Sequence, residues 1–206
     1  MDLETSKNLG GVGAILVVVS GLGFVGTGFA GLLSIVGLIL LLIALKGFSD
    51  NYKDMGIFNN ALYAVIAVIV GAVVATGTFF VTIFSVIPPD FDWTNPMAWQ
   101  QRFMDFDTFW ATFGGIVIGL IVALVLLFVF FVIAFMFFRR SMSILATKTG
   151  VGMFATAGLL MMIGAVLTVI LVGVILIWVG FILLAVAFFS IRTTAAPQPA
   201  TTPPSQ

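Results

Sequence analysis

The chain has 206 residues, of which 62% are hydrophobic and 8% are charged, and its basic and acidic side chains cancel to a formal net charge of zero. Soluble domains carry about 25% charged residues, so this composition excludes a water-soluble protein and predicts an all-α integral membrane protein. The balanced charge offers no basic surface to nucleic acid. Cysteine and histidine are absent, which removes disulfides, thiolate chemistry and the usual ligands of zinc, copper, haem and iron–sulfur clusters, so we expect no cofactor.

The first long apolar segment, residues 9–45, predicts a hairpin of two short membrane-spanning helices. It is nearly twice the length of about 20 residues that a helix needs to cross a bilayer core of roughly 30 Å. Gly26 and Gly28 in its middle permit turn conformations that other residues avoid. We therefore expect spans at residues 9–25 and 29–45.

Two longer spans are expected in the centre of the chain, at residues 57–87 and 109–138. Helices of this length measure about 45 Å, well beyond the thickness of a bilayer core. The excess must be taken up by tilt, by a break near Gly77 or by protrusion on the outer side. Gly115 and Gly119 form a GxxxG pair, which favours close helix packing within one chain over a dimer contact.

The outer loop, residues 88–108, contains the sequence Asp-Phe-Asp twice, at Asp90–Asp92 and Asp105–Asp107. Four carboxylates could hold calcium, but capping is the favoured interpretation. Asn95 followed by Pro96 is typical of the start of a short helix, and Asp107 or Thr108 can cap the fourth span. An interfacial aromatic belt is expected from six side chains of this region: Phe91, Trp93, Trp99, Phe103, Phe106 and Trp110.

The last apolar segment, residues 151–191, again predicts two spans, at 151–168 and 172–191, with a turn around residues 167–173. Residues 1–192 then form a single six-helix transmembrane domain in which two short hairpins flank two long central helices. The remaining residues, 193–206, are rich in Pro, Thr and Ala and predict a disordered tail.

The distribution of basic residues predicts the orientation. If the N-terminus is cytoplasmic and the chain makes six spans, only Arg102 of the eight basic residues lies outside. The positive-inside rule therefore favours a plasma-membrane protein with both termini in the cytoplasm. The seven residues on the inner side are Lys7, Lys46, Lys53, Arg139, Arg140, Lys148 and Arg192.

Two polar segments, Leu45–Tyr63 and Arg139–Phe154, are expected as short loops lying flat at the inner surface. In the first, Ser49 and Asp50 can cap the next helix. Their neighbouring cations could hold anionic lipid headgroups, so these loops are the candidate lipid or partner site. Its residues are Asp50, Tyr52, Lys53, Asn59, Asn60, Arg139, Arg140 and Lys148.

Three stretches, "LETSKNLGGVGAIL", "LIALKGFSDNYKDMGIFNNALY" and "FRRSMSILATKTGVGMFATAGLLMMIGAVLTVI", together resemble an archaeal family of multi-pass membrane proteins known as a domain-of-unknown-function family. The resemblance covers roughly residues 3–191 and includes the polar segments. It implies an archaeal plasma-membrane protein and supplies no catalytic residues.

The predicted function is that of a non-catalytic structural or accessory membrane protein that binds lipid or another membrane protein, with homo-oligomerisation left open. The expected spans contain no ionisable side chain, and no acid–base pair, nucleophile–base pair or metal cluster is visible. The alternative is a small transporter or channel for an uncharged or lipid-like substrate, whose path would be lined by the Thr and Asn residues of the third span. That alternative requires those residues to share one inward face.

Overall fold

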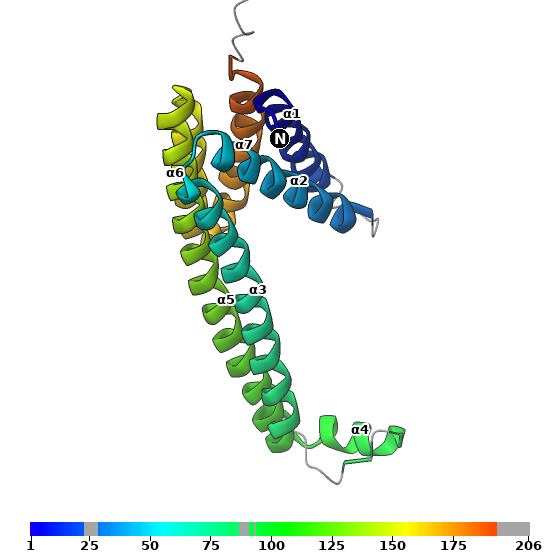
Figure 1. Ribbon diagram of the computed structural model, residues 1–206. Helices are drawn as coiled ribbons and strands as arrows, with labels where there is room; N and C mark the ends of the chain where they lie inside the picture. The colour runs from blue at the N-terminus through cyan, green and yellow to red at the C-terminus, as the bar shows by residue number, and fades with distance from the viewer. Residues whose placement is uncertain (23–28, 87–90, 93, 193–206) are drawn as a thin grey trace, which may run out of the picture.

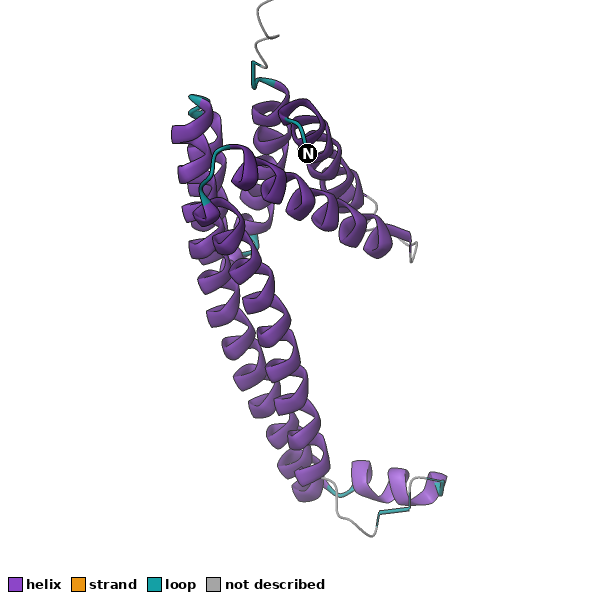
Figure 2. Cartoon of the chain, viewed as in Figure 1, coloured by secondary structure: helices purple, strands orange, loops and turns teal. Residues whose placement is uncertain are grey.

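The computed structural model describes residues 1–22, 29–86, 91–92 and 94–192, and over these residues it contains helices and no strands (Figure 2). The predicted turn at Gly26 and Gly28 and the tail at 193–206 lie outside the described residues. So do five side chains of the expected outer loop: Asp90, Trp93, Trp99, Arg102 and Phe103. The elements are α1 (Leu3–Leu22), α2 (Phe29–Asn51), α3 (Met55–Val86), α4 (Pro96–Met104), α5 (Phe106–Thr149), α6 (Met153–Leu167), the 3₁₀ turn η1 (Thr168–Ile170) and α7 (Val172–Phe189).

Five of these helices are long and apolar enough to cross a membrane: α2, α3, α5, α6 with η1, and α7. This confirms the predicted all-helical membrane-type fold. Helix α1 is not among the five because Glu4, Lys7 and Asn8 make its first two turns polar. Asp2 starts α1 by accepting a hydrogen bond of 2.7 Å from the backbone N–H of Thr5, as N-cap residues do.

The molecule consists of a cluster of short helices at one end of a long two-helix hairpin (Figure 1). We call the cluster of α1, α2, α6 and α7, with the adjoining turns of α3 and α5, the head. The arm is the remainder of the hairpin, residues 71–86 of α3 and 106–130 of α5. Both described chain ends lie at the head, away from the arm. Asn51 donates a hydrogen bond of 2.9 Å to the carbonyl of Met1, and Lys7 donates one of 2.8 Å to the carbonyl of Ile191.

The arm is held by small residues that let α3 and α5 approach closely. Gly119 faces Thr82, whose side chain occupies the space that a Cβ at Gly119 would need, and Gly115 faces Val86 in the same way. The GxxxG pair therefore packs within the chain, as predicted. Helix α3 passes through Gly77 without a break, so of the three ways to accommodate its length only tilt and protrusion remain.

Helix α5 continues without interruption for 44 residues and ends where Gly150 adopts a left-handed conformation with φ of 71°. The expected inner loop at Arg139–Phe154 is therefore wrong over most of its length. The physical reason is that residues 139–149 contain no Gly or Pro, and their apolar side chains recur at helical spacing. Met142, Leu145 and Ala146 are buried against the head.

Helices α6 and α7 form a hairpin whose turn falls within the interval expected from the sequence. The 3₁₀ turn Thr168–Ile170 is followed by Leu171, which has a positive φ of 62°. A non-glycine residue with this conformation is uncommon and carries some strain. Beside the turn the two helix backbones approach closely at Gly164 and Gly173, where a Cβ on either residue would overlap the carbonyl oxygen of the other.

The core lies in the head, where the ends of α2, α3 and α5 meet α6 and α7. Phe48, Phe154 and Phe188 are fully buried and their rings form one cluster. The ring centroid of Phe188 lies 5.9 Å from that of Phe48 and 5.0 Å from that of Phe154. On the other side of the head, the indole N–H of Trp178 on α7 donates a hydrogen bond of 3.0 Å to the carbonyl of Val18 on α1. Burial of aromatic rings and this interhelical bond fix α1 and α7 side by side.

Candidate functional site

The polar segment between α2 and α3 is a tight turn of three residues, Tyr52–Asp54. Helix α2 runs through Ser49 and Asp50 to Asn51, so neither residue caps α3 as expected. Asp54 does so instead, accepting a hydrogen bond of 3.0 Å from the backbone N–H of Gly56. The hydroxyl of Ser49 is buried and donates to the carbonyl of Asp54 at 2.9 Å, which closes the turn.

Sequence reasoning missed Asp54. The available signal was an aspartate directly before an apolar helix start, the usual place of an N-cap. The same carboxylate lies 3.3 Å from the ammonium group of Lys148 at the end of α5. Lys46 pairs with Asp50 one turn away on α2. Because both pairs are substantially exposed, each contributes little to stability, but each neutralises one cation of the expected inner surface.

Tyr52 lies in the same turn and is half-buried. Its ring stacks on Phe48 with centroids 6.3 Å apart, and burial raises the pKa of its phenol above the ordinary value. Lys53 follows with an exposed side chain and a positive φ of 51°. The ring of Tyr52 therefore belongs to the packed head, whereas Lys53 faces outward.

Arg139 and Arg140 do not lie beside Lys148, because α5 is a continuous helix between them. Nine residues separate Arg139 from Lys148, which corresponds to about 13 Å along the axis. The guanidinium of Arg139 lies 3.3 Å from the sulfur of Met162 on α6, and that of Arg140 lies 6.0 Å from the ring of Phe137. The basic residues of the expected site thus occupy two levels.

Two contacts between α3 and α5 fix the level of Asn60. Ser141 donates to the carbonyl of Ile57, and the rings of Tyr63 and Phe137 meet edge to face at 5.7 Å. These contacts bracket Asn60 on α3 and Arg140 on α5, so the two residues lie at the same height. Asn60 donates to the carbonyl of Gly56 at 2.7 Å within its own helix.

The eight predicted residues therefore divide into two groups. Asp50, Tyr52, Lys53 and Lys148 lie at the end of the head, and Asn59, Asn60, Arg139 and Arg140 lie closer to the arm.

A groove that sequence reasoning did not predict runs between α2 and the α3–α5 hairpin. Figure 1 shows α2 leaving α3 at the turn and diverging from it toward its own start. The space has a volume of about 500 Å³, within the range of about 300–1,000 Å³ usual for small-molecule sites. Its lining is entirely apolar: Ile35, Leu38, Ile39, Leu41, Leu42, Leu45, Ala61, Ala64, Val65, Val68, Ile69, Ala134, Phe135, Phe138 and Phe181.

The floor of the groove is formed by small or buried side chains, and its rim by exposed ones. Ala61, Ala64 and Ala134 are buried between α3 and α5, whereas Ile35 and Ile69 on the two rims are more than half exposed. Three alanines at the floor create the hollow, because larger side chains there would fill it. Lys46 continues the rim of α2 beyond Leu42, and its ammonium lies 5.7 Å from the ring of Phe58 on α3.

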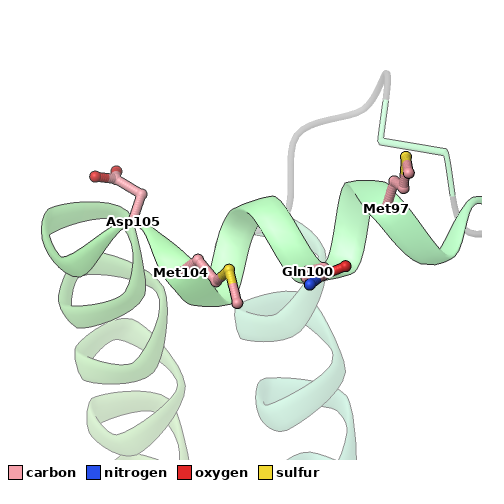
Figure 3. Close-up of a pocket in the computed structure, with 4 residues that line it drawn as sticks. All are labelled: Met97, Gln100, Met104 and Asp105. Atoms are coloured by element: carbon pink, nitrogen blue, oxygen red, sulfur yellow. The ribbon is translucent and has the colours of Figure 1, made fainter.

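The far end of the arm holds α4 and a shallow pocket of about 400 Å³ (Figure 3). The predicted short helix is confirmed: Asn95 caps it by accepting a hydrogen bond of 2.9 Å from the N–H of Met97. Asp105, not Asp107 or Thr108, caps α5, accepting a hydrogen bond of 3.1 Å from the N–H of Thr108. The hydroxyl of Thr108 also donates to this carboxylate, and the two bonds, the hydroxyl bond first, lower the pKa of the Asp105 carboxyl.

Figure 3 shows the Asp105 carboxylate pointing away from the side chains of Met104 and Gln100, which line the same pocket. Asp92 likewise accepts from the N–H and hydroxyl of Thr94. Over the described part of the chain, no three carboxylates gather as a metal site would require. In this region Asp105 therefore caps α5, and Asp92 closes the turn before α4.

Three hydroxyls of the third span are hydrogen-bonded within their own helix. Thr78 and Thr82 donate to the carbonyls of Val74 and Thr78 in their own helix, and Ser85 to that of Thr82. Thr76 is exposed and lies on the opposite side of α3 from Thr78. Thr78, Thr82 and Ser85 follow one another at helical spacing and share one face of α3, on which Thr82 meets Gly119 of α5.

Comparison with known proteins gives one family and one relative. A family described as a protein of unknown function, DUF996, matches residues 33–182. An uncharacterised protein of the archaeon Methanocaldococcus jannaschii is 32% identical over 194 residues, which cover 93% of this chain and 94% of that protein. No solved structure matches. The resemblance seen in the sequence is thereby confirmed, and every residue that lines the groove falls inside the matched segment.

Proposed function

The chain belongs to the DUF996 family of proteins of unknown function, and we propose that it is a non-catalytic accessory protein of the cell membrane that holds the hydrocarbon chain of a membrane lipid. The observation that carries this proposal is the apolar groove between α2 and the α3–α5 hairpin. Four of the helices that border it, α2, α3, α5 and α7, are apolar enough to cross a membrane. A groove flanked by such helices opens toward lipid.

The chemistry of the lining selects the occupant. No side chain of the groove offers a hydrogen-bond donor or acceptor, so a polar ligand would lose its hydrogen bonds to water without replacement. A hydrocarbon chain has no such cost and would fill space that is otherwise poorly packed. The ion pair of Lys46 and Asp50 at the head end of the rim offers one cation and one anion to a polar headgroup.

We propose six spans with both termini in the cytoplasm and the head on the cytoplasmic side. Support comes from the five apolar helices, from both described chain ends lying at the head, and from the basic residues of that end. Helix α5 measures about 66 Å at 1.5 Å per residue. That length exceeds the roughly 40–45 Å of a bilayer with its headgroups, so the ends of α5 protrude from the bilayer.

A non-catalytic role is supported by the bonds that five of the described carboxylates make. Asp50 and Asp54 pair with lysines, and Asp2, Asp92 and Asp105 cap helices or turns. A carboxylate committed in this way is poorly placed to act as a general base. The arm presents apolar side chains to its surroundings on both helices, among them Val73, Val81 and Ile118. These surfaces suit lipid or the helix of another membrane protein.

The proposal is tested by filling the groove. Val65→Trp places a large ring between α2 and α5, and Val73→Trp makes the same change on the exposed arm two turns farther along α3. Native mass spectrometry of protein extracted gently from its membrane would count the retained lipid. We expect lipid on the wild type and on Val73→Trp, and its loss from Val65→Trp. Equal retention by all three proteins would refute the groove as the lipid site.

A further inference from the structure

Arg139 and Arg140 differ from Lys46 and Lys148 in having no acidic partner among the described residues. Among the described residues, neither guanidinium lies within ion-pair distance of a carboxylate, whereas Lys46 and Lys148 both do. Their neighbours are a methionine sulfur for Arg139 and an aromatic ring for Arg140. Apart from Asn59, Asn60 and the phenol of Tyr63, the adjoining residues of α3 at this level are apolar. Arginines without an acidic partner in such surroundings are expected to bind an anion.

The three polar side chains at this level of α5 share one surface of the helix. Ser143 follows Arg139 by four residues and Arg140 by three, so all three are neighbours on the helix. All three are exposed. The groove lies on a different face of α5, where Ala134 and Phe138 form its floor and wall. The arginine surface is therefore separate from the proposed chain site.

The length of α5 indicates what kind of anion the two arginines bind. From Arg139 to Trp110 the helix runs for 29 residues, or about 44 Å. A bilayer measures about 40–45 Å when its headgroups are included. Trp110 belongs to an exposed aromatic cluster with Phe106 and Phe113, and such clusters mark the membrane interface. The two arginines then lie at the level of the headgroups in the opposite leaflet.

We propose that Arg139 and Arg140, together with the hydroxyl of Ser143, bind the phosphate of an anionic membrane lipid on the outer surface of α5. Guanidinium groups match phosphate oxygens with paired hydrogen bonds. Lys148, at the end of the head, lies about 13 Å farther along the axis of α5. The lipid phosphates bound by the two arginines would therefore lie closer to the arm than Lys148 does.

The test uses the full-length protein in detergent and two lipids with identical chains. Phosphatidylglycerol carries the phosphate and diacylglycerol lacks it. Retention of each would be measured by native mass spectrometry for the wild type, for R139Q/R140Q and for Lys148→Gln as the matched control. We expect the double variant to lose phosphatidylglycerol by at least about tenfold, the cost of losing charge-assisted hydrogen bonds. Lys148→Gln should behave like the wild type, and diacylglycerol retention should not change.

Two results would overturn the inference. Phosphatidylglycerol retention by R139Q/R140Q equal to that of the wild type would remove the arginines from the site. Displacement of phosphatidylglycerol by excess inorganic phosphate would assign the site to a free ion. Arg140→Gln alone serves if the double variant does not fold, because Arg140 is exposed and its guanidinium lies over Phe137 of α5 itself. Val65→Trp separates the two proposals, since it should abolish chain binding in the groove and leave phosphate-dependent binding intact.

Discussion

The hydroxyl of Ser141 on α5 donates a hydrogen bond of 2.6 Å to the carbonyl oxygen of Ile57 on α3, and both residues are fully buried. This bond joins the two long helices at the point where the groove ends and the packed core of the head begins. Leu45 of α2 is buried beside it and lines the last part of the groove. The position of α3 against α5 at this hydrogen bond therefore determines the depth of the groove.

Replacing Ser141 by Ala should destabilise the protein. The change removes one buried hydrogen bond, which typically contributes about 0.5–1.5 kcal/mol to the free energy of unfolding. Ser143→Ala, two residues away and exposed, is the matched control and should stay within about 0.5 kcal/mol of the wild type. Unfolding in a denaturing detergent measures both. An unchanged Ser141→Ala protein would mean that the bond does not join the helices in the membrane.

A second prediction concerns the packing of the arm. Gly119→Ala should lower stability by about 1–3 kcal/mol, as overpacked sites do, because the new methyl group would overlap the side chain of Thr82. Gly114→Ala lies on the same helix and meets open space, so it should be neutral or stabilising by up to about 1 kcal/mol. The two midpoints of unfolding give the comparison. If both variants behave alike, α3 and α5 do not approach closely in the arm.

The phenol of Tyr52 provides a prediction for pH. Burial raises its pKa above the unfolded value of about 10. Because the raised pKa belongs to the folded state, the contribution of Tyr52 to stability is complete below pH 10 and is lost as pH rises through the folded pKa. In the Tyr63→Phe variant Tyr52 is the only tyrosine, so tyrosinate absorbance reports it alone. Titration of the folded variant at the same pH as the denatured variant would contradict its burial.

Both termini are expected on the cytoplasmic side, and the chain suits a direct test because it contains no cysteine. Asn8, Thr94 and Arg192 are exposed positions near the start, in the outer loop and at the end of the described chain, and each can be replaced singly by cysteine. A membrane-impermeant maleimide should label Thr94→Cys in intact cells and the other two only after lysis. Labelling of Asn8→Cys but not Arg192→Cys in intact cells would indicate an odd number of spans.

The helical membrane-type fold was predictable because it follows from local sequence properties. Apolar segments of sufficient length specify spans, and Asn95 with Pro96 specifies the start of α4 without help from the rest of the chain. We expected a loop around Arg139 because a pair of charges usually indicates the end of a span, and this prediction was wrong. Helix α5 continues there since no residue before Gly150 interrupts it, and Met142 and Leu145 bury its continuing apolar face.

The groove and the pairing of charges could not be predicted from the sequence. The groove depends on the angle at which α2 leaves α3, and this angle is set by packing in the head, whose core includes Leu41, Leu45 and Ala61 of the groove lining. Asp54 and Lys148 are far apart in the chain and meet because α3 and α5 run antiparallel with the register that Ser141 and Ile57 fix. Such relationships arise only once the helices are assembled.

The most direct test of the proposed function is a cryo-electron microscopy map of the protein in lipid nanodiscs, at a resolution that shows side chains. Binding of a lipid chain predicts an elongated density in the groove, in contact with Ala64 on α3 and Phe135 on α5 and leading toward Lys46. A map in which α2 packs directly on α3 and α5, so that side chains of the protein fill the groove, would contradict the proposed function.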